Sequence, residues 1–162
     1  MSQSPVNPIP DGFNSLTPHL VCKGALQAID FYKQAFGAEE IFRLAAPDGS
    51  LIHASLRVGN SMLLLADECP PMGAFGPKKL GGSPVTIHLS VPDVDASVAR
   101  AVAAGAKPQM PVTEMFWGAR YGVLQDPFGH SWSVATQIKN LSHDEIQAGL
   151  AAAMCDPLAK AG

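Results

Sequence analysis

The chain is poor in charged residues and in long apolar runs, and each shortage excludes a class of protein. Only 15% of its 162 residues are charged, against about 25% in ordinary soluble proteins. The 11 basic and 14 acidic side chains give a net charge of −3 without any basic run, which argues against nucleic acid and anionic membrane as partners. No apolar stretch approaches the roughly 18 residues that a membrane-spanning helix needs.

Cysteine is also scarce. Cys22, Cys69 and Cys155 are odd in number and far apart, so they predict neither a disulfide framework nor a zinc knuckle. The first ten residues lack the basic and apolar segments of a secretory signal. We therefore expect a soluble, cytoplasmic protein. The low charge content also suggests that another subunit covers some apolar surface, which predicts a homodimer.

The sequence contains an internal duplication. His19 and His88 are both followed by Leu in an extended segment, and they lie 69 residues apart. The helices that follow end near Gly37 and Gly105, which lie 68 residues apart. Such a constant offset is typical of a repeated unit.

Each unit is predicted to be a strand, a helix and then three strands, which makes an α+β fold. The apolar residues of 25–36 recur near helical spacing, and Gly37 ends that helix. Ser142 and Glu145 form a capping box that opens a last helix. The predicted segments are a Pro-rich arm (1–14), a first βαβββ module (15–66), a linker or lid loop without regular structure (67–83), a second βαβββ module (84–138) and a C-terminal helix (142–160), together one domain.

Strand alternation places three histidines on the sheet face away from the helices. Side chains along a strand point to opposite faces in turn, so His19, His53 and His88 are expected to line a polar or mixed concave face. They can be hydrogen-bonded cavity residues, or they can bind a metal or move protons. Spacing alone leaves both interpretations open, because no close HxH or HxxxH pair occurs.

Four segments resemble the vicinal-oxygen-chelate superfamily, which includes glyoxalase I, bleomycin-resistance proteins and extradiol dioxygenases. They are residues 28–38 (AIDFYKQAFGA), 53–57 (HASLR), 115–122 (MFWGARYG) and 126–132 (DPFGHSW). The last two are the more specific, and they resemble the PhnB-like branch. The resemblance implies that the two modules form an incomplete eight-stranded barrel around a cavity, within one chain or across a homodimer.

The resemblance also implies a metal site, but other residue types stand at its ligand positions in this chain. Relatives with glyoxalase activity hold one divalent metal with four side chains on the opening and closing strands. The matching positions here are Thr17, Leu64, Thr86 and Ser133. Hydroxyls and a leucine do not replace imidazole and carboxylate as ligands, so we expect no metal cofactor there. A shifted site from His19 and His88 is the alternative, for which His53 is expected to be too distant a third ligand.

The loop between the predicted strands 107–112 and 120–125 supplies candidate ligand contacts. Phe116, Trp117, Arg120 and Tyr121 lie together in the sequence, and an aromatic surface with an arginine can hold a planar or anionic ligand. Trp132 is expected in the core, and His130 is expected either to end a turn or to join the site.

Three functions remain open at this stage. The first is glyoxalase-like lyase or isomerase chemistry, with His19, His53 or His88 as acid–base groups and Arg120 holding an anion. The second is metal-free binding or sequestration of a small molecule, as in bleomycin resistance. The third is a structural or regulatory role with an empty cavity. The sequence does not identify the ligand.

Overall fold

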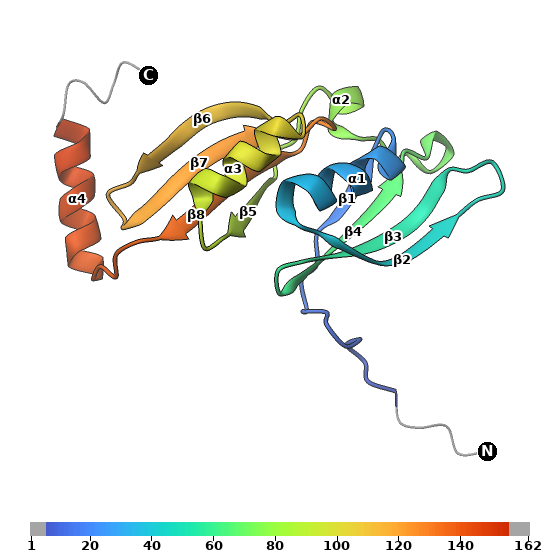
Figure 1. Ribbon diagram of the computed structural model, residues 1–162, viewed down its shortest axis with the longest axis horizontal. Coiled ribbons are helices and arrows are strands. Elements are labelled where there is room, and N and C mark those ends of the chain that lie inside the picture. The colour runs from blue at the N-terminus through green and yellow to red at the C-terminus, as the bar shows by residue number, and fades with distance from the viewer. Residues whose placement is uncertain (1–5, 156–162) are drawn as a thin grey trace.

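The fold consists of two βαβββ modules side by side, followed by a separate C-terminal helix (Figure 1). The structure is a computed structural model that describes residues 6–155, so the ends of the predicted arm and last helix lie outside the described residues. The first module contains β1 (His19–Cys22), α1 (Ala25–Phe36), β2 (Glu39–Ala45), β3 (Leu51–Val58) and β4 (Ser61–Asp67). The second contains β5 (Thr86–Ser90), α3 (Val94–Ala103), β6 (Lys107–Glu114), β7 (Ala119–Gln125) and β8 (Ser131–Gln137).

Each module forms its own four-stranded mixed sheet with the same strand order. The orders are β1-β4-β3-β2 and β5-β8-β7-β6, and the first pair in each sheet is parallel. The registers also match, because His19 lies opposite Leu64 and His88 opposite Ser133. The structure therefore agrees with the predicted duplication at the level of individual residue pairs. The two sheets do not close into a barrel within this chain, so each leaves one face open.

Helices α1 and α3 cover the other faces and pack against each other (Figure 1). The N-terminus of α1 is held by Asp67, whose Oδ1 accepts hydrogen bonds from the backbone amides of Gly24 (3.2 Å) and Ala25 (2.7 Å). Thr136 holds the N-terminus of α3 in the same way, because its hydroxyl accepts a hydrogen bond from the Val94 amide at 2.8 Å. Both residues come from the last strand of their module, which fixes each helix to its own sheet.

One buried carboxylate joins the modules. Asp126 Oδ2 accepts from the Tyr32 hydroxyl at 2.5 Å and from Trp132 Nε1 at 2.9 Å. Its Oδ1 accepts from the backbone amides of Phe128 and His130, both at 2.9 Å. All five residues are buried, as expected for Trp132. This network and the surrounding aromatic rings set the position of one sheet relative to the other.

The segment between the modules is more ordered than the sequence analysis predicted. It contains a 3₁₀ helix, η1 (Pro70–Met72), and a short α-helix, α2 (Pro77–Leu80). The expectation of a loop without regular structure was therefore wrong. Proline at the start and left-handed Gly81 at the end are the signals that define α2. The Glu68 carboxylate also accepts from Gly76 N at 2.9 Å and holds the loop closed.

The C-terminal helix α4 (His143–Cys155) stands at the far end of the second module (Figure 1). The capping box predicted from the sequence is present, because Ser142 N donates to Glu145 and Glu145 N donates to Ser142 Oγ. None of its residues is fully buried. No helix in residues 6–155 combines the length and apolar character needed to cross a membrane.

Candidate functional site: the open sheet faces

His19 on β1 and His88 on β5, the first strands of the two modules, have different surroundings. Leu20 and Cys22 of β1 are buried under α1, so His19 points to the open face, as alternation predicts. In β5, Ile87 and Leu89 pack against the core and His88 points to the open face. The predicted orientation of these histidines is therefore confirmed.

On the first sheet, His19 meets His53. Their ring centroids are 5.9 Å apart in an edge-to-face arrangement, although the two residues belong to strands separated by β4. The rings lean together more closely than we expected from the strand spacing. Burial lowers the pKa of His19, and the positive form of His53 lowers it further. His53 Nε2 in turn lies 3.2 Å from Ser55 Oγ.

On the second sheet, His88 is held by a hydroxyl and an aromatic ring. Its Nδ1 lies 2.8 Å from Ser133 Oγ, on the directly opposite residue of β8. Its ring stacks on Tyr121 with a centroid distance of 6.2 Å and an interplanar angle of 16°. A hydroxyl that donates to Nδ1 leaves the ring proton on Nε2, which makes that atom a donor.

The aromatic surface continues from Tyr121 to the loop before β7. Trp117 packs edge-on against Tyr121 at 5.6 Å, and Phe116 packs edge-on against Trp117 at 4.9 Å. Three of the four predicted pocket residues thus form one continuous surface beside His88. Of these three residues, Trp117 lines a cavity on the open face, whereas Tyr121 and Phe116 contact Trp117 without lining that cavity.

A cavity of about 620 Å³ opens on this surface. It is uncharged in character, because no Asp, Glu, Lys or Arg is among the described residues that line it: His88, Ser90, Val91, Pro92, Trp117, Ala119, Ala135, Thr136 and Gln137. Ser90 shares this face with His88, as strand alternation along β5 predicts. Ala135 and Gln137 were not among the expected site residues, although they continue the alternation of Ser133 along β8.

Two smaller hollows lie between the modules, each lined by residues from 16–21 and from 84–90. One, of about 280 Å³, includes His19, His130 and Phe75. The other, of about 380 Å³, includes His88, Trp132 and Met62. His130 belongs to the junction of the modules rather than to the open face, since its Nε2 lies 3.1 Å from Val21 O and 3.8 Å from Cys22 Sγ. Burial and nearby carboxylates raise the pKa of the Cys22 thiol well above its usual range, so it is a poor nucleophile.

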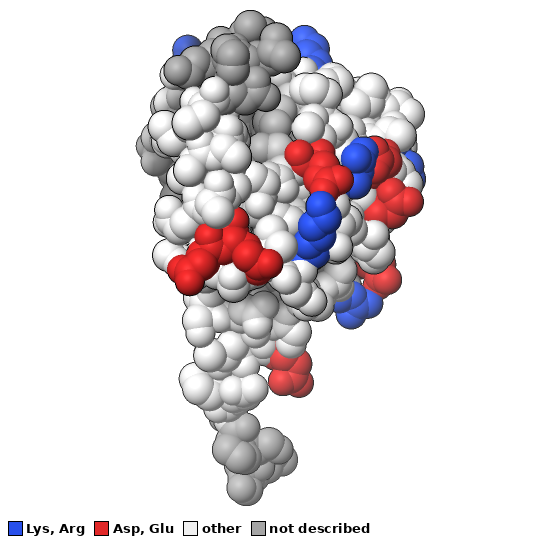
Figure 2. Space-filling view, turned by 90° about the vertical axis from the view of Figure 1, so that its left-hand side faces the viewer, with Lys and Arg blue, Asp and Glu red and all other residues white. Residues whose placement is uncertain are grey.

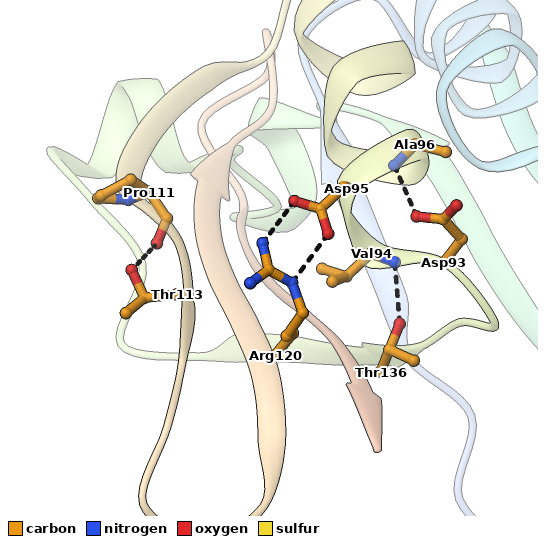
Figure 3. Close-up of polar contacts among 8 residues, drawn as sticks. All are labelled: Asp93, Val94, Asp95, Ala96, Pro111, Thr113, Arg120 and Thr136. Atoms are coloured by element: carbon orange, nitrogen blue, oxygen red, sulfur yellow. Dashed lines mark hydrogen bonds and ion pairs between the residues drawn. The ribbon is translucent and has the colours of Figure 1, made fainter. Parts of the chain in front are cut away.

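Arg120 differs from the expectation that it holds an anion beside Trp117. It lies on the helix side of its sheet, where Nε and the terminal nitrogen bond both oxygens of Asp95 on α3, at 2.9 and 2.7 Å (Figure 3). The physical reason is alternation, since neighbours Arg120 and Tyr121 must point to opposite faces. This fork-shaped pair ties β7 to α3 and leaves the cavity without that cation.

The residues present do not fit a metal of the type that glyoxalase-active relatives hold. Ser133 hydrogen-bonds His88, and its counterpart Leu64 offers no donor atom. Thr86 lies opposite Ser131, another neutral hydroxyl. Within residues 6–155, no three His, Cys, Asp or Glu side chains gather to form a possible metal site. Neutral hydroxyls give a dication little charge compensation.

Comparison with known proteins identifies the family. The profile of the Glyoxalase/Bleomycin resistance protein/Dioxygenase superfamily matches residues 13–134. The chain belongs to this superfamily. An uncharacterized protein of Mycobacterium tuberculosis is 48% identical over 139 residues, which are 84% of this chain and 82% of the relative.

Solved structures share the fold. An Arabidopsis thaliana gene product is 32% identical, with 76% of this chain and 98% of that one covered and a TM-score of 0.62. A PhnB protein from Bacillus cereus is 19% identical, with 76% and 99% covered and a TM-score of 0.60. Superfamily membership supports a small-molecule enzyme or binding protein.

Proposed function

We propose that this protein binds an uncharged, planar small molecule without the help of a metal. The observation that carries the proposal is the cavity on the second sheet, which joins an aromatic wall to neutral polar groups. Trp117 lines the cavity and offers a ring surface for stacking, and Tyr121 supports that ring edge-on. His88 and Gln137 supply hydrogen-bonding groups beside them. A charged ligand would find no opposite charge among these lining residues.

A second copy of the chain is proposed to complete the cavity. Phe42 and Leu44 lie opposite Ser55 and His53 in the first sheet, so they share the open face with the histidines. Their side chains are 53% and 48% exposed. Large apolar side chains grouped on an uncovered sheet face are typical of an interaction surface. The open face of one copy would then cover the cavity of the other.

The dimer has a direct test. Light scattering at micromolar concentration is expected to give twice the 17.0 kDa chain mass. Phe42→Asp is expected to give the monomer mass, because it buries a carboxylate at the proposed contact. Ile9→Asp is the control, since Ile9 is an exposed apolar residue of the N-terminal arm, before β1. A wild-type mass near 17 kDa would refute the dimer.

Ligand class is tested with a matched pair of probes. Titration calorimetry should detect 2-naphthol, which is neutral at pH 7, and should find naphthalene-2-sulfonate much weaker. Trp117→Ala should weaken 2-naphthol binding about twofold to twelvefold, since an aromatic pair contributes about 0.5–1.5 kcal/mol. Arg120→Ala is the control and should bind normally. Preference for the sulfonate, lost in Arg120→Ala, would overturn the proposal in favour of an anion site.

Glyoxalase-like lyase or isomerase chemistry is the second candidate. The bond between His88 and Ser133 favours it, because it orients one imidazole toward the cavity as an acid–base group. In that case solvent deuterium should exchange into a bound carbonyl substrate such as dihydroxyacetone. His88→Gln should abolish the exchange, and His143→Gln, an exposed residue of α4, should not change it.

A further inference from the structure

The aromatic wall of the cavity is supported from behind by the C-terminal helix. A Cβ placed on Gly149 of α4 would lie 3.2 Å from both Cβ and O of Phe116. Such contacts are tighter than ordinary van der Waals packing, so α4 approaches the backbone of Phe116 this closely because position 149 carries no side chain. Phe116 is the residue immediately before Trp117.

The segment that leads into α4 holds the same turn. The amides of Ile138 and Lys139 both donate to Gly118 O at 2.9 Å. Gly118 itself has a left-handed φ of 88°, and a Cβ there would lie 2.7 Å from Lys139 O. The turn that carries Trp117 is therefore enclosed on two sides by chain that follows β8.

These contacts form an unbroken path from α4 to the cavity. Gly149 contacts Phe116, whose ring meets Trp117 at 4.9 Å. Trp117 meets Tyr121 at 5.6 Å, and Tyr121 stacks on His88 at 6.2 Å. Each ring depends on the next for its orientation, because the rings pack edge-on or stacked rather than standing alone.

Helix α4 itself is weakly attached. Its inward residues, Ile146, Gly149 and Ala153, recur at helical spacing but are only half-buried. Figure 2 shows acidic and basic groups on the face at this end of the molecule, with uncharged surface between them. An isolated helix of 13 residues is marginal in water, so α4 depends on its contact with the Phe116 turn.

We propose that α4 is a positioning element for the ligand wall, with Gly149 and Phe116 as the positioning residues for Trp117. The docked helix holds the Trp117 ring in the orientation that lines the cavity. By reciprocity, a planar ligand that stacks on Trp117 stabilises the docked helix. This second part rests on the proposed function, whereas the first part concerns the free protein alone.

The free protein is tested by ¹⁹F NMR after labelling with 5-fluorotryptophan. The two tryptophans give two resonances, assigned with Trp117→Phe, and buried Trp132 serves as the internal reference. Gly149→Leu is expected to shift and broaden the Trp117 resonance and to leave that of Trp132 in place. Ala151→Leu is the matched control on the exposed side of α4 and should change neither resonance. Gly149→Ala adds only a Cβ, 3.2 Å from Cβ and O of Phe116, and should shift the Trp117 resonance less than Gly149→Leu does.

The second readout is binding of 2-naphthol to the same variants. Gly149→Leu should lose about tenfold in affinity, and Ala151→Leu should lose none. Deletion of residues 143–162 gives the same test without a bulky side chain and should also broaden the Trp117 resonance. An unchanged Trp117 resonance in both Gly149→Leu and the deletion would overturn the inference. If the resonance moves as expected and wild type binds no 2-naphthol, the positioning role holds and the proposed ligand class fails.

Discussion

The hydroxyl of Tyr32 is expected to contribute substantially to stability through a single atom. It is fully buried on α1 and donates to Asp126 Oδ2 at 2.5 Å, across the junction of the two modules. Tyr32→Phe removes this donor and keeps the ring. A hydrogen bond to a carboxylate contributes about 1.5–3 kcal/mol, and we expect a loss of about 2 kcal/mol in the free energy of unfolding. For a domain of this size that corresponds to about 4–8 °C in Tm.

The remaining donors limit that cost. After Tyr32→Phe, Asp126 still accepts from Trp132 Nε1 and from two backbone amides, so the carboxylate is not left unpaired. Asp126→Ala is different, because it leaves four buried donors without an acceptor. At about 1–3 kcal/mol for each stranded group, it should cost at least about 4 kcal/mol and exceed Tyr32→Phe by twofold or more.

Urea and thermal unfolding followed by circular dichroism measure both effects. Tyr121→Phe is the matched control, since it removes the same atom from a half-buried tyrosine on the open sheet face, and it should change stability by less than about 0.5 kcal/mol. Equal losses in Tyr32→Phe and Tyr121→Phe would refute the reasoning. So would an Asp126→Ala variant as stable as Tyr32→Phe.

Three further expectations concern alkaline pH, metal and helix capping. Burial raises the pKa of Tyr32 and of Cys22, so the folded protein keeps these protons to a higher pH than the unfolded chain does. The free energy of unfolding should therefore fall above about pH 9–10, and chemical unfolding should show a shallower fall for Tyr32→Phe. Zinc or nickel should leave Tm unchanged, and an anomalous diffraction peak touching both His19 and His88 would contradict this. Asp67→Ala should cost about 1–2 kcal/mol by urea unfolding, because Asp67 caps α1 and also accepts from Leu51 N, whereas exposed Asp48→Ala should cost less.

The alternation of residues along strands and the internal duplication predicted the parts of the fold that depend on local sequence. The shared register of His19 with Leu64 and of His88 with Ser133 follows from one repeated unit. The burial of Trp132 follows from its alternation with Ser131 and Ser133. These features depend on residues that lie close together in the sequence, so they can be predicted from it.

The parts that sequence did not predict depend on distant contacts. Whether the sheets close depends on how α1 meets α3 and on the bonds of Asp126, and neither is visible in a local pattern. Arg120 was grouped with Tyr121 because they are adjacent in the chain, although adjacency in a strand separates two side chains onto opposite faces. The contact of Gly149 with Phe116 joins segments 33 residues apart, and a single glycine in an Ala-rich helix carries no such signal.

The equivalent positions of the two modules have diverged in chemistry while keeping their geometry. His88 faces the hydroxyl of Ser133, whereas His19 faces the apolar Leu64 and turns to His53 instead. The second sheet thereby presents neutral polar groups beside aromatic rings, and the first presents a histidine pair among the exposed apolar residues of β2. If a second copy closes the cavity, these unlike faces would form its two walls. The uncharged ligand that we propose would then contact two chemically different walls, whereas a dication would need three or four carboxylate or imidazole ligands, and no such group of three gathers within residues 6–155.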